Sequence, residues 1–192
     1  VFKKFLKQKK FNDLPIIETE SLKKKYSPKK YKIIIAVGYL EMNDVRKHAF
    51  KFLKKEGYNF ENYIDNDSLI FPNMKIGTNN FILENVSINP ETKIGSGNVV
   101  WSNSVISHNV SIKDFNWISS GCVISGDCKV GNNNFFGSNS TISNNTFIPN
   151  YTFLGAGTLI SGKIESNKTY IKEKTIKYNF ESKKFLKLLK NE

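Results

Sequence analysis

An apolar residue recurs every six residues over nearly half of this 192-residue chain. Counted from Ile70, the recurring positions are Ile76, Ile82, Ile88, Ile94, Val100, Ile106, Ile112, Ile118, Ile124, Val130, Phe136, Ile142, Ile148, Leu154 and Ile160. An α-helix has 3.6 residues per turn and a strand has a side-chain period of two, so neither explains a period of six. A six-residue repeat of this kind is the signature of a parallel β-helix.

The residues between the repeated positions fit the same fold. Two residues before most of the repeated positions stands a short side chain: Thr92, Ser104, Val110, Cys122, Cys128, Ser140, Thr146, Thr152 and Thr158. Three hexads make a triangular coil of 18 residues, which stacks residues 18 apart at the strand spacing of about 4.8 Å. The sequence therefore predicts a mainly β chain with about five coils and an interior rich in isoleucine, whose β-branched side chain is stiff.

The segment before the repeat has the pattern of a small α/β unit. The run KIIIAV, residues 32–37, is short and continuously apolar, which predicts a strand buried on both faces. Gly38 ends this run. Asn43 or Asp44 is then expected to cap a helix that continues to about Glu56.

These patterns divide the chain into three regions. Residues 1–67 make the small α/β unit, residues 68–165 the β-helix, and residues 166–192 an extension with a short helix. A Rossmann-like unit opens with a strand and a glycine-rich turn, and residues 1–30 contain no such turn. We therefore expect a reduced or incomplete Rossmann-like domain. The apolar face expected for the C-terminal helix consists of Phe185, Leu186, Leu188 and Leu189.

Charge is unevenly distributed along the chain, whose formal net charge is +12. Residues 1–67 carry 16 basic and 9 acidic residues, residues 68–162 carry 4 and 4, and residues 163–192 carry 9 and 4. Nucleic-acid-binding proteins concentrate basic residues on their recognition surface, whereas the regular segment here is neutral. We expect solvated lysines on the flanking segments and no nucleic acid as a partner. Binding of small phosphate-bearing ligands is the alternative explanation for these lysines.

Other patterns narrow the class of protein further. No stretch approaches the roughly 18 consecutive apolar residues of a membrane span. Cys122 and Cys128 lie six residues apart inside the repeat and form no metal motif with the two histidines. A zinc enzyme on such a fold needs three histidine ligands. We expect no metal, and we expect reduced, buried cysteines in a cytoplasmic protein.

His108 is the residue in the repeat that points to chemistry. It follows the inward Ile106 by two residues, so it is expected to lie at a coil corner and to point outward. Histidine titrates near neutral pH and is the commonest general base. An exposed corner residue without a role is the alternative for His108. His48 lies beside Arg46 and Lys47 in the predicted helix and is expected to be a surface residue.

The order of a small α/β unit and then this β-helix resembles one family of hexapeptide-repeat sugar acetyltransferases. These are left-handed β-helical enzymes of the bacillosamine N-acetyltransferase and sialic acid O-acetyltransferase-like type. The stretches that carry the resemblance are AVGYLEMNDVRKHAF and SHNVSIKDFNWISSGCVISGDCKVGNNNFFG. The resemblance implies a homotrimer with acetyl-CoA as co-substrate in a groove between two β-helices. It also implies a nucleotide-linked sugar as acceptor, for surface glycan synthesis, and direct acetyl transfer to an amino group.

The same resemblance implies roles for individual residues. His108 matches the general base, and the amide of Gly126, one coil further on, matches the donor to the thioester oxygen. The residues expected to border acetyl-CoA are Gly126, Asn144, Gly162, Lys163 and Lys168, the two lysines meeting its phosphates. The residues expected to bind the acceptor are Gly38, Tyr39, Asn109 and Trp117.

The chain departs from the family pattern at several positions, and these leave alternatives open. Asn109 stands where relatives often carry an acidic residue or histidine, and Trp117 and Gly121 stand where relatives have a second histidine. An ordinary strand-to-helix turn is the alternative for Gly38 and Tyr39. A sugar O-acetyltransferase and a catalytically inactive trimeric β-helix scaffold are the alternative functions.

Overall fold

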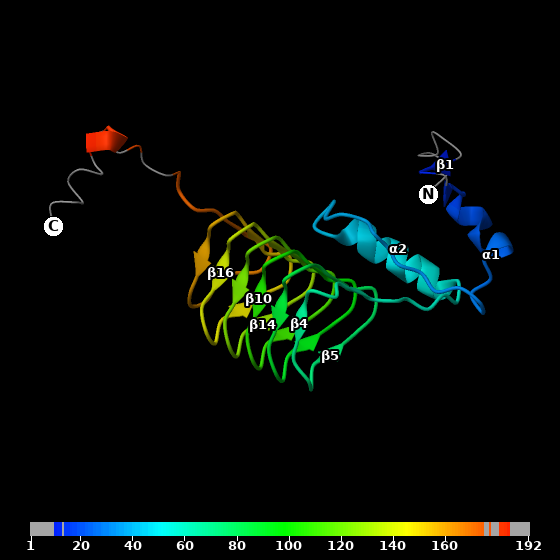
Figure 1. Cartoon of the computed structure of the whole chain (residues 1–192), viewed down its shortest axis with the longest axis horizontal. Helices are drawn as coiled ribbons and strands as arrows, with labels where there is room; N and C mark the ends of the chain where they lie inside the picture. The colour runs from blue at the N-terminus through cyan, green and yellow to red at the C-terminus, as the bar shows by residue number, and fades with distance from the viewer. Residues whose placement is uncertain (1–9, 13, 175–176, 178–180, 185–192) are drawn as a thin grey trace.

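The structure is a computed structural model that describes residues 10–12, 14–174, 177 and 181–184. Residues 63–170 wind into a parallel β-helix whose strands are each two residues long (Figure 1). The strands stack into three sheets of seven, six and five strands. The predicted parallel β-helix is therefore confirmed.

Each sheet takes every third strand of the chain, except that β20 follows β18 in the seven-stranded sheet. The seven-stranded sheet contains β3 (Tyr63–Ile64), β6 (Phe81–Ile82), β9 (Val99–Val100), β12 (Trp117–Ile118), β15 (Phe135–Phe136), β18 (Phe153–Leu154) and β20 (Thr169–Tyr170). The six-stranded sheet contains β4 (Leu69–Ile70), β7 (Ser87–Ile88), β10 (Val105–Ile106), β13 (Val123–Ile124), β16 (Thr141–Ile142) and β19 (Leu159–Ile160). The five-stranded sheet contains β5 (Lys75–Ile76), β8 (Lys93–Ile94), β11 (Ser111–Ile112), β14 (Lys129–Val130) and β17 (Phe147–Ile148).

The register follows the predicted step of three hexads through most of the β-helix. Val105 pairs with Val123, for example, and Ile106 with Ile124. Strands β3 and β20 lie outside the predicted range of 68–165, so the β-helix is about six coils long and not five. The step shortens at the end, where Phe153 pairs with Thr169 and not with Ile171, the residue that three full hexads would bring beside it.

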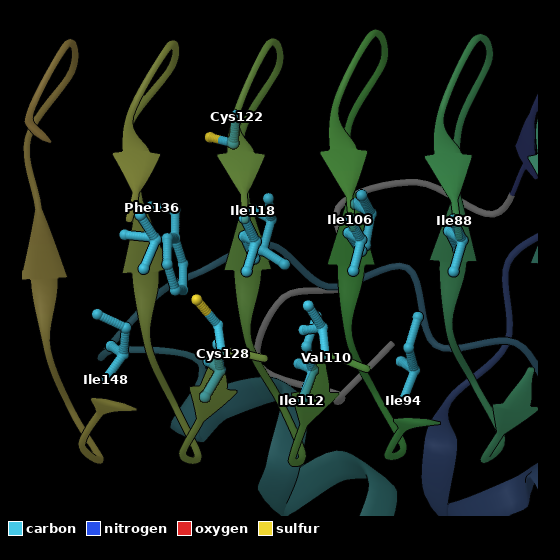
Figure 2. Close-up of a cluster of buried hydrophobic side chains, with 14 of the residues drawn as sticks. Ile88, Ile94, Ile106, Val110, Ile112, Ile118, Cys122, Cys128, Phe136 and Ile148 are labelled. Carbon is cyan, nitrogen blue, oxygen red and sulfur yellow. The ribbon is translucent and has the colours of Figure 1, made fainter. Parts of the chain in front are cut away.

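The second residue of nearly every strand points into the coil and builds the core. Ile88, Ile106, Ile118 and Phe136 have no exposed surface, and Figure 2 shows them inside the coils. β-branched side chains suit this position because they are stiff and pack well on a sheet. The predicted core positions are therefore confirmed.

The two cysteines lie in the coil interior, as expected. Both are free thiols, and the Sγ atoms of Cys122 and Cys128 donate to the carbonyl oxygens of Gly137 (3.2 Å) and Ser143 (3.1 Å). Burial raises the pKa of both thiols. A thiol with a raised pKa is a poor nucleophile, so the two cysteines serve as small packing residues.

A buried asparagine ladder runs along one corner of the coils, and the sequence analysis missed it. Each side-chain Oδ1 atom accepts the backbone N–H of the equivalent residue in the next coil; for Asn80 and Asn98 this distance is 2.9 Å. The ladder ends where Thr152 donates to Asn134 at 2.7 Å. Such bonds satisfy amides that would otherwise be buried without a partner. Its members are Asn62, Asn80, Asn98, Asn116 and Asn134.

The small unit contains the predicted helix, α2 (Asp44–Lys55), which lies beside the β-helix (Figure 1). Its predicted capping is wrong. Asn43 precedes the helix with a left-handed φ of 69°, and no side chain caps the first turn. The Asn43 amide instead donates to the carbonyl of Asn134 at 3.1 Å, which ties the helix start to the β-helix.

The predicted strand at residues 32–37 is wrong in most of its length. Only Ile33 forms a bridge, to Phe60, and Ile34 is 45% exposed. The N–H of Ile35 donates to the side chain of Asn79 in the β-helix at 2.7 Å. The side chain of Asn79 thus accepts a hydrogen bond that, in a Rossmann sheet, a backbone carbonyl of a neighbouring strand would accept.

The remaining elements before the β-helix are short. They are the antiparallel pair β1 (Lys10–Phe11) and β2 (Leu14–Pro15), the 3-10 turn η2 (Thr19–Ser21) and α1 (Leu22–Lys25). Residues 182–184 are helical, but the expected apolar face at 185–189 lies outside the described residues. None of the helices that the structure describes is long and apolar enough to cross a membrane.

Candidate active site

His108 occupies the corner between β10 and β11, where the six-stranded sheet meets the five-stranded sheet. Its side chain is exposed, as predicted. The next residue, Asn109, has a left-handed φ of 58°, which asparagine tolerates better than most residues. The Asn109 Nδ2 atom lies 3.3 Å from Nδ1 of His108. A neutral amide therefore lies beside the imidazole.

Gly126 lies directly against the imidazole of His108. A Cβ atom added to Gly126 would fall 2.7 Å from Cε1 and 2.8 Å from Nε2 of the ring. Any other residue here would push the ring away, so glycine is required for this close approach. Within the described part of the chain, no hydrogen bond leaves the Gly126 N–H. An unoccupied donor thus lies next to the one histidine of the β-helix.

The other residues expected along the acetyl-CoA groove lie toward the C-terminal end of the β-helix. Asn144 continues the corner column of His108 and Gly126 and is exposed. The column becomes irregular at Gly162, which has a φ of 82° and begins the shortened last coil. Lys163 and Lys168 are exposed, and Lys168 Nζ lies 4.0 Å from a Glu165 oxygen.

A second group of predicted residues comes together on the seven-stranded sheet. The Tyr39 ring lies 5.1 Å from the Trp117 ring and 4.8 Å from the Phe135 ring. Gly38 and Trp117 line an apolar cavity of about 240 Å³. The other lining residues are Ala36, Val37, Phe81, Leu83, Val99 and Trp101.

The structure does not bring the two groups of predicted residues together within one chain. His108 and Asn109 lie at the corner between the six- and five-stranded sheets. Trp117 lies on the seven-stranded sheet, which is the side of the triangle opposite that corner. A site that uses both groups therefore needs a second copy of the chain.

Arg46, which packs over the Trp117 ring, is a structural residue that the sequence analysis missed. It is the only arginine of the chain, is fully buried, and packs over the Trp117 ring at 5.7 Å. Its Nη1 atom donates to the carbonyls of Val37 (3.1 Å) and Gly38 (2.9 Å), and Nε donates to Gly97 (3.0 Å).

The remaining contacts of Arg46 are also to uncharged oxygens. Its Nη2 atom donates to the side chain of Asn43 (2.9 Å) and to the carbonyl of Asn116 (3.3 Å). No ion pair involves Arg46 among the described residues, and burial lowers its pKa to about 10. The guanidinium thus fastens the small unit to the β-helix. The chain has one arginine and 28 lysines, and this is the sequence signal that could have pointed to Arg46.

The start of α2 is fastened by a second polar cluster. The Tyr151 hydroxyl donates to Asp44 at 3.0 Å, and Lys47 Nζ lies 2.9 Å from the same hydroxyl and 3.1 Å from Asn133. Tyr151 and Asn133 occupy equivalent left-handed corner positions in successive coils. The small unit therefore packs along one edge of the β-helix, which is not the corner that holds His108.

No group of three or more metal-ligating side chains occurs within the described residues.

The comparisons with known proteins concern first the repeat itself. Residues 73–108 and 109–144 each match the family model described as bacterial transferase hexapeptide (six repeats). The match covers residues 73–144, which is less than half of the chain. A search among curated proteins finds no match.

Solved structures resemble nearly the whole chain. The acetyltransferase domain of PglB from Neisseria gonorrhoeae is 23% identical with a TM-score of 0.78, and the match covers 86% of this chain and 80% of that one. The same domain in complex with acetyl coenzyme A gives a TM-score of 0.79 at 23% identity, covering 86% and 79%. PerB from Caulobacter crescentus, in complex with CoA and GDP-perosamine, is 17% identical with a TM-score of 0.79, covering 85% and 78%. At these identities the likeness establishes the fold, and it confirms the fold that the sequence resemblance implies.

Proposed function

We propose that this protein is an acetyl-CoA-dependent acetyltransferase that acetylates an amino group of a nucleotide-linked sugar. The observation that carries the proposal is the His108 imidazole against the free amide of Gly126, at an exposed corner of a transferase-type hexapeptide β-helix. The solved structures named above support it, because their descriptions include acetyltransferase, acetyl coenzyme A and a nucleotide sugar.

In the proposed reaction, the amine of the acceptor attacks the thioester carbon of acetyl-CoA. His108 takes the proton that the amine loses, which is the role of a general base. The Gly126 N–H donates to the oxygen that becomes negative in the tetrahedral intermediate. Collapse of the intermediate breaks the carbon–sulfur bond and leaves the amide product. The departing CoA thiolate takes the proton back from His108, which releases CoA as the thiol and restores the neutral imidazole. Both substrates are bound at once, so no acyl-enzyme is needed.

Asn109 has a defined part in this proposal. When its side-chain oxygen faces the ring, it accepts a hydrogen bond from the protonated Nδ1 of His108, which leaves Nε2 unprotonated and free to act as the base. Exchange of the nitrogen and oxygen of an asparagine amide needs only a rotation of the group. The neutral amide then fixes the tautomer, which a carboxylate does in many other catalytic histidines.

The acceptor is proposed to bind where Gly38, Tyr39 and Trp117 meet. An apolar cavity lined by two tryptophans suits the apolar face of a sugar ring. Because this cavity lies opposite the His108 corner of the same chain, we propose a homotrimer. In it, the cavity of one subunit faces the histidine of the next.

Thiol release from acetyl-CoA tests the reaction directly. The acceptors are UDP-, dTDP- and GDP-linked sugars in matched pairs that carry an amino group or a hydroxyl at the same carbon. The proposal predicts acceptor-dependent thiol release with one amino sugar and not with its hydroxyl partner. Release with only the hydroxyl sugar contradicts N-acetylation. No release and no binding of acetyl-CoA contradict the transferase function and favour the scaffold.

Gly126→Ala tests the contact between the histidine and the amide. The added methyl group displaces the imidazole, and a misplacement of about 1 Å costs on the order of 10²-fold in rate. The control is Gly157→Ala, on another corner, where the added atom comes no closer than 3.8 Å to Cδ of Lys172. Gly157 has a φ of 67°, so this variant also carries the backbone strain of a left-handed alanine and is the harsher of the two for the fold. Activity that falls equally in both variants contradicts the proposed arrangement.

A further inference from the structure

The small unit carries a group of lysines without acidic partners. Residues 22–55 contain ten lysines and two acidic residues, Glu41 and Asp44. Asp44 lies at the start of α2, where it accepts a hydrogen bond from Tyr151 of the β-helix. Residues 22–40 and 45–55 therefore present positive charge only. Within the described residues, seven of these lysines are exposed and form no ion pair: Lys24, Lys25, Lys29, Lys30, Lys51, Lys54 and Lys55.

Contacts between the two helices of the small unit bring these lysines together. Lys23 Nζ in α1 lies 3.1 Å from a carboxylate oxygen of Glu56, which directly follows α2. The unpaired lysines of α1 therefore lie near Lys54 and Lys55 in the last turn of α2. Figure 1 shows α1 at the end of the molecule that points away from the coils. The lysines thus form a basic surface at the outer end of the small unit.

The same end of the molecule has an apolar groove of about 480 Å³. Leu22 of α1, Phe52 of α2 and residues 33–37 are among its lining residues. Ile34 and Phe52 are 45% and 41% exposed, although both are large apolar side chains. Lys55 follows Phe52 by three residues and is its neighbour on the helix surface. Exposed apolar side chains therefore border the unpaired lysines.

An exposed apolar patch with a polar rim marks an interaction surface. A second copy of the chain would bring seven more lysines against the first seven, so repulsion opposes that partner. A nucleic acid would attract the lysines but would leave Ile34 and Phe52 without an apolar partner. An anionic bilayer suits both features, because its headgroups attract lysines and its headgroup–acyl boundary accepts apolar side chains.

We propose that the outer end of the small unit binds the surface of a membrane that contains anionic phospholipids. Lys24, Lys51 and Lys55 attract the headgroups, and Ile34 and Phe52 enter the boundary below them. This inference does not rest on the proposed acetyl transfer. Together with that transfer, it would place the reaction at a membrane surface.

Sedimentation with vesicles tests the proposal. The wild type is expected to sediment with vesicles of equal parts phosphatidylcholine and phosphatidylglycerol, and to stay in solution with phosphatidylcholine alone. The triple variant Lys24→Gln, Lys51→Gln and Lys55→Gln removes three charges from the surface. Each lysine near an anionic membrane contributes several-fold to affinity, so the loss should be on the order of 100-fold. Added salt should weaken wild-type binding, because it screens the charges.

The apolar contact has a test of its own. Phe52→Ala keeps all the lysines and should lower affinity for the mixed vesicles about tenfold, because it removes apolar surface that would leave water. The matched control is Phe147→Ala, on the β-helix, where Phe147 is 56% exposed. It should leave affinity unchanged. Unchanged affinity in Phe52→Ala would overturn the proposal, since the lysines would then act without the groove.

Two further outcomes would also overturn the proposal. The variant Lys75→Gln with Lys93→Gln and Lys129→Gln removes the same charge from exposed positions of the β-helix and should bind vesicles like the wild type. No sedimentation of the wild type, or an equal loss in both triple variants, contradicts a surface on the small unit. Binding of a double-stranded RNA, lost in the first triple variant and without sedimentation with vesicles, assigns the surface to nucleic acid instead. Circular dichroism of each variant checks that the β-helix is intact.

Discussion

The β-helix and the small unit beside it differ in what holds them together. In the β-helix each coil repeats the contacts of the coil before it, so isoleucine rows and the asparagine ladder extend over many coils. The small unit has one long helix, one isolated bridge and a separate cluster around Phe50 and Phe60. It depends on the β-helix for Phe115 and for the partners of Arg46. The coils of the β-helix are stabilised by contacts with one another, whereas the small unit has no sheet of its own and packs against the β-helix instead.

Truncation of a core isoleucine is expected to have the largest effect on stability. Ile118 is fully buried in the middle of the β-helix, and Ile118→Ala should cost about 2–5 kcal/mol of unfolding free energy. Because the small unit is docked on the β-helix, both regions should unfold together, as measured by circular dichroism and tryptophan emission. Val105→Ala, on the outward side of β10, is the matched control and should cost less. If Ile118→Ala lowered the stability reported by tryptophan emission and left the circular dichroism transition of the β-helix unchanged, the dependence of the small unit on the β-helix would be contradicted.

Arg46→Lys is expected to act on the small unit and spare the β-helix. Lysine cannot reproduce the hydrogen bonds that the planar guanidinium donates to carbonyl groups of both regions. Hydrogen bonds of charged groups are worth about 1.5–3 kcal/mol each. The chain has two tryptophans, Trp101 and Trp117, and both line the cavity at the junction. In Arg46→Lys we therefore expect the tryptophan emission to shift to the red at a lower denaturant concentration than the one at which the circular dichroism signal of the β-helix is lost.

The control for that experiment is Lys54→Arg, an exposed change on the same helix, which should leave the emission unchanged. Coincident loss of both signals in Arg46→Lys would mean that the two regions form a single cooperative unit. The contrast between a self-supporting repeat and a dependent unit would then be wrong.

A corner substitution is expected to have the smallest effect. Asn145 has a φ of 57°, and Asn145→Ala should cost on the order of 1 kcal/mol because alanine tolerates this conformation poorly. Asn145→Gly should cost less, since glycine adopts it freely. Thermal unfolding of the two variants measures the difference. An equal loss in both would assign the effect to the side chain's contacts and not to backbone conformation.

The repeat was predictable because it is local and periodic. A six-residue period fixes which residues point inward, and the step of three hexads fixes their neighbours, so Gly126 could be placed against His108 from the sequence. Strand β3 keeps the pattern, since Ile64 precedes Ile70 by six residues and pairs with Ile82, so the count from Ile70 began one hexad too late. Strand β20 was missed because the shortened last coil pairs Phe153 with Thr169.

The small unit was less predictable because long-range contacts decide its structure. The apolar run 32–37 has strand propensity, but its partners are an asparagine side chain and a buried arginine from other parts of the chain.

The most direct test of the whole account is the loss of activity when the base is removed. With the acceptor identified by thiol release, kcat/KM for acetyl transfer is measured for wild type, His108→Ala and His48→Ala. The account predicts a loss of about 10²–10⁴-fold in His108→Ala, the usual contribution of a general base. It predicts no change in His48→Ala, which removes the only other histidine, an exposed residue of α2. Full activity in His108→Ala, with an intact β-helix by circular dichroism, would contradict it.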